Sequence, residues 1–64
     1  MRNREAEAAA EEARTWADNV EAARQRCRDT QGTDSHESAV WACRRVERRW
    51  AQAVEHARSV RDQS

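Results

Sequence analysis

The chain of 64 residues has no proline, and its only glycine is Gly32, at the middle. Proline and glycine disfavour helix most strongly, so only this one point of the sequence is unfavourable for helix. Leucine, isoleucine, phenylalanine, tyrosine and lysine are also absent. The apolar residues are therefore mostly alanine and valine, with three tryptophans, and most of them bury little area each. We expect a thin core and marginal stability for a single chain.

The chain also has no net charge. Twelve arginines balance twelve acidic residues, so net charge predicts neither nucleic-acid nor membrane binding. No apolar run is long enough for a membrane span or a signal peptide, and we expect a soluble protein of unspecified location. Because leucine and lysine are normally among the commonest residues, their absence favours an engineered sequence over an extreme codon bias.

Two segments carry small and apolar residues in alternating steps of three and four, the spacing of a coiled-coil seam. This spacing predicts helices over about 4–30 and 35–62, joined by a turn over 31–34 that contains Gly32. Asp34 and Glu37 have the spacing of a capping box at the start of the second helix. The seam positions are Ala6, Ala9, Ala13, Trp16, Val20, Ala23, Cys27 and Thr30, then Ala39, Cys43, Val46, Trp50, Ala53, Ala57 and Val60.

Two helices with one short turn predict an all-α, single-domain protein over 1–64: an antiparallel two-helix hairpin of the coiled-coil type. Two registers are open. The first sets Cys27 level with Cys43 and pairs large with small residues along the seam, which favours it. The second has a shorter turn and places Trp16 opposite Trp50.

The two cysteines occupy equivalent seam positions. In the first register, a Cys27–Cys43 disulfide is expected; it would close a loop of about fifteen residues and stabilise the fold by about 3 kcal/mol. Two reduced thiols packed as small core residues are the alternative. His36 lies one heptad before Cys43, but the paired spacings of zinc sites are missing. We therefore expect no metal and no other cofactor.

The third tryptophan, Trp41, falls on the outer face of the second helix. Arg44, Arg45 and Arg48 flank it, and tryptophan with arginine is typical of interface hot spots. These four residues form a candidate partner-binding surface for an acidic protein or a nucleic acid. The alternative is a solvated face in which the Trp41 ring lies over a neighbouring arginine, and the zero net charge favours this alternative.

The two flanks of the seam differ in polarity. One flank carries four apolar residues, and a second hairpin that docks there would complete a four-helix bundle from two chains. A monomer is the alternative. The residues of this candidate dimer face are Ala10, Ala17, Val40 and Val54.

No set of residues has the spacing of a catalytic site. His36 and His56 are far apart along the chain, and no serine or cysteine has a histidine at a sequence spacing that would indicate a nucleophile and its base. We therefore expect a protein that is not an enzyme. The leading hypothesis is a structural or de novo designed helical hairpin that self-associates through helix packing, with no membrane partner. The alternative is a small binding module that uses the Trp41 surface.

Overall fold

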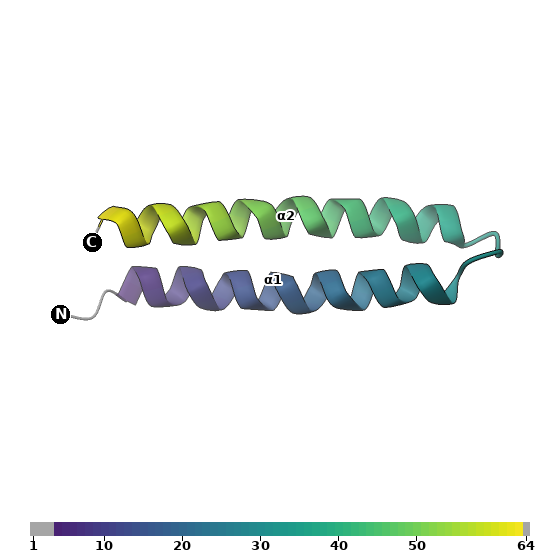
Figure 1. Cartoon of the computed structure of the whole chain (residues 1–64), viewed down its shortest axis with the longest axis horizontal. Coiled ribbons are helices and arrows are strands. Elements are labelled where there is room, and N and C mark those ends of the chain that lie inside the picture. The colour runs from purple at the N-terminus through teal and green to yellow at the C-terminus, as the bar shows by residue number, and fades with distance from the viewer. Residues whose placement is uncertain (1–3, 64) are drawn as a thin grey trace.

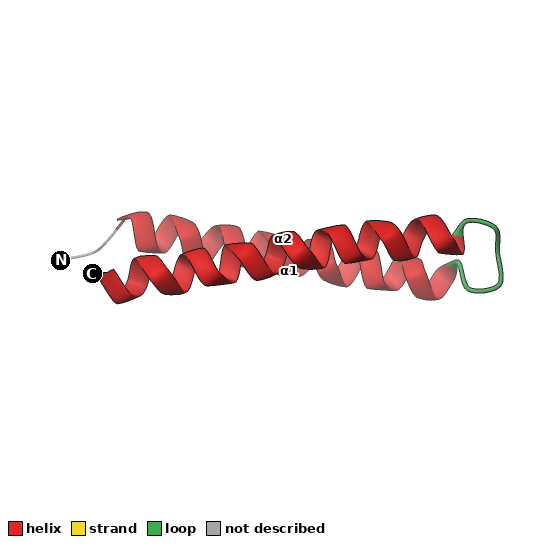
Figure 2. Ribbon diagram, turned by 90° about the horizontal axis from the view of Figure 1, so that it is seen from above, coloured by secondary structure: helices red, strands yellow, loops and turns green. Residues whose placement is uncertain are grey.

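The structure is a computed structural model that describes residues 4–63. It consists of helix α1, Arg4–Asp29, and helix α2, His36–Gln63. The two helices lie antiparallel and side by side along their whole length (Figures 1 and 2). The molecule measures 51 × 13 × 10 Å along its principal axes. The predicted all-α helical hairpin is confirmed.

Charges near the helix ends suit the helix dipoles. Glu5 and Glu7 lie in the first turn of α1, and Arg26 and Arg28 lie in its last turn. In the same way α2 begins with Glu37 and ends with Arg61. Acidic groups at a helix N-terminus and basic groups at its C-terminus are each favourable by about 0.3–1 kcal/mol when exposed. These charges support two helices whose apolar contact is small.

Gly32 shapes the turn between the helices. Its φ angle is 81°, in the left-handed region where glycine has no steric cost, as predicted. The Thr33 backbone N–H donates to the Thr30 carbonyl at 3.0 Å, which makes Gly32 the third residue of a β-turn, a position where a positive φ gives the type II geometry. The Thr33 hydroxyl donates to the same carbonyl at 2.6 Å.

The turn covers residues 30–35 and is longer than the predicted 31–34. The second helix begins one residue later than expected, and the Ser35 carbonyl accepts its first helical hydrogen bond, from the N–H of Ala39 at 3.0 Å. Ser35 therefore holds the N-cap position that we had predicted for Asp34. The longer turn is possible because the hydroxyls of Thr30 and Thr33 bond to backbone carbonyls there.

The core follows the predicted seam. Six of the described residues are buried, with 4–8% of their surface exposed, and every one is a seam position: Ala9, Val20, Ala39, Cys43, Ala53 and Val60. Trp16 and Trp50 also lie on the seam but are only half-buried. No side chain of residues 4–63 is less than 2% exposed. Two helices alone therefore do not enclose a fully dry core.

Contacts between the helices bear on the register. Across the turn, Thr30 Oγ1 lies 3.4 Å from His36 Nδ1, and these two residues are paired in the second register. Trp50 borders the same surface hollow as Val20, because helical side chains point back toward the N-terminus of their helix, which for α2 is the turn. The second register sets the two cysteines about four residues out of step.

Candidate functional site

Trp41 and its neighbours form one surface on the outside of α2. Trp41 is 60% exposed, and together with Arg44, Arg45 and Arg48 it lines a single shallow hollow. Their spacing of three, four and seven residues places them on one side of the helix. The structure thus brings together all four predicted residues, which we call the arginine–tryptophan surface.

One arginine of this surface contacts the tryptophan ring. The guanidinium carbon of Arg44 lies 5.6 Å from the centroid of the Trp41 ring, which is within the range of a cation–π interaction. This contact was expected in the solvated-face interpretation. It holds Arg44 at the ring while more than half of the Trp41 surface stays open to solvent.

The basic region extends further than the sequence analysis indicated. Arg45 also lines a neighbouring hollow with Trp16, Val46 and Arg49. The four-residue surface predicted from the sequence includes neither Arg49 nor the half-buried Trp16. The step of four from Arg45 to Arg49 was a usable signal, whereas the proximity of Trp16 depends on how α1 packs against α2.

These arginines are not matched by local carboxylates. Within residues 4–63, an ion pair between the helices joins Arg24 and Glu47, with Arg24 Nη2 donating to Glu47 Oε2 at 2.8 Å. In the same part of the chain, Arg44, Arg45, Arg48 and Arg49 form no ion pair. Glu47, the one acidic residue among them in sequence, is engaged by α1. The outer side of α2 is therefore positive over this segment.

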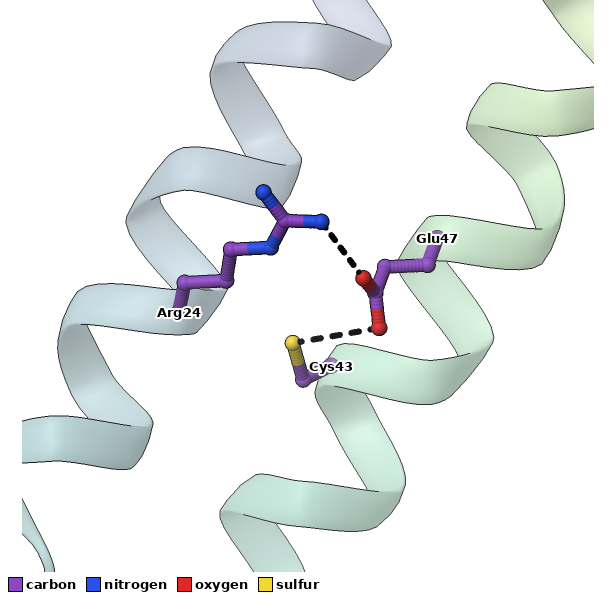
Figure 3. Close-up of polar contacts among 3 residues, drawn as sticks. All are labelled: Arg24, Cys43 and Glu47. Atoms are coloured by element: carbon purple, nitrogen blue, oxygen red, sulfur yellow. Dashed lines mark hydrogen bonds and ion pairs between the residues drawn. The ribbon is translucent and has the colours of Figure 1, made fainter.

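Glu47 also contacts a buried cysteine (Figure 3). Cys43 donates its S–H to Glu47 Oε1 with a sulfur–oxygen distance of 3.7 Å, while Arg24 binds the other oxygen. The hydrogen bond from Arg24 lowers the pKa of the Glu47 carboxyl below its ordinary value. Burial raises the pKa of the Cys43 thiol, with the Glu47 charge as the next cause. The cluster therefore keeps Glu47 ionised and Cys43 protonated.

Both cysteines are free thiols, so the predicted disulfide between Cys27 and Cys43 is not formed in this structure. The alternative of two reduced thiols describes what is seen. The bond would need Cα atoms within about 7 Å, and equivalent seam positions meet at that distance only in the first register. Cys43 is buried against Glu47, and Cys27 is half-buried.

The predicted dimer face lies on the flank of the hairpin that carries Arg24 and Glu47. Ala10 is exposed, and Ala17, Val40 and Val54 are half-buried. Two shallow hollows lie along this flank and include all of these residues except Val40. One is lined by Ala6, Ala10, Ala13, Val54, Ala57, Arg58 and Arg61, and the other by Ala17, Val20, Glu21, Arg24, Arg28 and Trp50.

Residues 4–63 carry neither a metal-binding cluster nor a membrane-spanning helix. No cluster of three or more histidine, cysteine or acidic side chains capable of holding a metal ion occurs there, and His36 lies beside Thr30. Neither α1 nor α2 is long and apolar enough to span a membrane. Comparison with family models, with curated proteins and with solved structures finds no match to this chain.

Proposed function

We propose that this protein is a structural helical hairpin without catalytic activity, and that two copies self-associate through the Ala10, Ala17, Val40 and Val54 flank into a four-helix bundle. The observation that carries the proposal is the accessible surface. The chain exposes 5408 Å², whereas a compact protein of 7.4 kDa exposes about 4200 Å². The excess of roughly 1200 Å² is larger than the about 800 Å² per partner that a standard interface buries.

The chemistry of the flank supports a second copy as the occupant. Alanine and valine side chains line most of the first hollow, and small residues allow helices to approach closely. A twofold axis through the flank would cover the half-buried Trp50 of each copy as well. Such burial stabilises a core in which only six residues are buried within one chain.

Sedimentation equilibrium of the unmodified chain tests the proposal. We expect a species of twice the 7.4 kDa chain mass at micromolar concentrations. The double variant Val40→Glu and Val54→Glu places like charges across the twofold interface and should give a monomer with a lower melting temperature. A single monomeric species of the unmodified chain at high micromolar concentration would refute the proposal.

A matched control separates the flank from a general effect of added charge. Ala8 and Ala22 are exposed, one heptad position outside the opposite flank. Ala8→Glu with Ala22→Glu adds the same charge on that side of α1, and this variant should remain a dimer. If both double variants dissociate equally, the Val40 and Val54 flank is not the interface.

A further inference from the structure

The segment of α2 from Trp41 to Arg49 concentrates positive charge on one side. Four of its nine residues are arginine, and its one carboxylate, Glu47, is bound by Arg24 of α1. Folding needs only polar side chains at these outer positions, and glutamate or glutamine, whose helix propensities are close to that of arginine, would serve as well. Since the chain is neutral overall, the positive field is local to this surface.

The exposed ring indicates which anion fits. Arginine binds phosphate and carboxylate alike through its planar guanidinium. Trp41, however, offers a flat apolar surface that is 60% exposed. Bases of a single strand stack on such rings, whereas aspartate and glutamate side chains carry no flat ring and the bases of a duplex are stacked inside it.

We propose that Trp41, Arg44, Arg45, Arg48 and Arg49 bind single-stranded nucleic acid, with the arginines on phosphates and the Trp41 ring under an unpaired base. The guanidinium of Arg44 lies over the ring, 5.6 Å from its centroid, so a base that stacks on that face displaces it toward the adjoining phosphate. The surface is about 12 Å long at 1.5 Å per residue, so one copy contacts only a few nucleotides.

This function is independent of the proposed self-association. The dimer flank is lined by the hollows beside Ala10 and Trp50, and Trp41, Arg45 and Arg48 line a separate hollow on the outside of α2. No residue belongs to both surfaces, so the sedimentation experiment and the binding experiment can fail separately. Two such surfaces in one dimer would bind a longer strand more tightly than one.

Salt dependence gives a quantitative expectation. Each phosphate neutralised on a single strand contributes about −0.7 to the slope of log K against log salt concentration. Four arginines therefore predict a slope of about −3. Removal of two of them should reduce the slope to about −1.4, and loss of one stacked base should weaken binding about tenfold.

Fluorescence anisotropy of labelled oligothymidylate and oligouridylate over a salt series tests the proposal. The probes for other ligand classes are a duplex of the same length and polyglutamate. We expect the single strands to bind most tightly. Trp41→Ala should weaken this binding about tenfold. Arg45→Gln with Arg48→Gln should reduce the salt slope to about −1.4. The control, Arg4→Gln with Arg14→Gln, makes the same charge change on exposed residues of α1 and should retain the affinity of the unmodified chain.

Several outcomes would overturn the proposal. The first is that neither oligonucleotide binds at low salt. The second is that the duplex or polyglutamate binds as tightly as the single strands or more tightly. The third is that Trp41→Ala leaves the affinity unchanged. An equal loss of affinity in the Arg4 and Arg14 control would also overturn it, because binding would then follow net charge alone. Circular dichroism of each variant shows whether it remains helical, and Arg45→Ala with Arg48→Ala, which also removes both charges and favours helix, serves if the glutamine variant unfolds.

Discussion

The seam between the helices and the outer face of α2 use tryptophan in different ways. On the seam, Trp50 lies half-buried among small residues such as Val20 and contributes apolar area that alanine and valine cannot supply. On the outer face, Trp41 is 60% exposed and touches Arg44. The difference indicates that the seam residues stabilise the hairpin, while the outer residues are available for a partner.

The largest expected effect separates the two tryptophans. Trp50→Ala should lower the free energy of unfolding by about 2–3 kcal/mol, because it leaves a cavity beside the seam. Trp41→Ala should change it by less than about 0.5 kcal/mol, since water replaces an exposed ring. Urea unfolding of both variants at one protein concentration measures the difference. Equal losses would mean that Trp41 is buried in an interface.

A smaller effect distinguishes two alanines within α2. Ala53 is buried on the seam and Ala51 is exposed. Ala51→Gly should cost about 1 kcal/mol through helix propensity alone, and Ala53→Gly should cost about 2 kcal/mol because a buried methyl group is lost as well. The same urea experiment applies. If the exposed site proves the more sensitive, the assignment of seam and surface is wrong.

The rates at which Cys27 and Cys43 are alkylated report how deeply each thiol is buried in the seam. The raised pKa of Cys43 leaves less thiolate at neutral pH, so we expect alkylation of folded Cys43 to be roughly tenfold slower than that of the half-buried Cys27. Because burial raises the pKa of the Cys43 thiol, the protonated thiol contributes fully to the stability of the fold below the ordinary cysteine pKa. This contribution is lost as the pH rises through the raised pKa. Mass spectrometry of timed alkylation, with unfolded chain as the control, gives both rates. An absence of free thiols would instead indicate the disulfide.

The smallest expected effect concerns the ion pair between Arg24 of α1 and Glu47 of α2. Because Arg24 lowers the pKa of Glu47, the contribution of this pair to stability is present at neutral pH and is lost as the pH falls through that lowered pKa. Both side chains are exposed, so Arg24→Gln should shift the melting temperature only slightly. Carboxyl titration by NMR should show the Glu47 pKa rising toward its ordinary value in Arg24→Gln. Arg26→Gln is the control, and an equal rise there would contradict a specific pair.

The sequence was sufficient to predict the hairpin, because seam spacing and one glycine determine where the helices form and stop. All six buried residues were predicted seam positions, and Gly32 has the expected positive φ. The cysteine pairing was not predictable, since spacing gives the face of a residue but not its level on the partner helix. The proximity of Trp16 to Arg45 and Arg49 was not predictable for the same reason, since Trp16 meets these residues only once the two helices are packed.

The antiparallel arrangement also makes the length of the molecule an adjustable quantity. The start of α1 and the end of α2 lie at one end of the 51 Å rod and the turn lies at the other (Figure 1). Seven residues added to each helix at matching seam positions would lengthen the rod by about 10 Å and return the chain to the same end. A hairpin of this kind, placed within another chain, can therefore hold its turn at a chosen distance while the flanking segments stay adjacent.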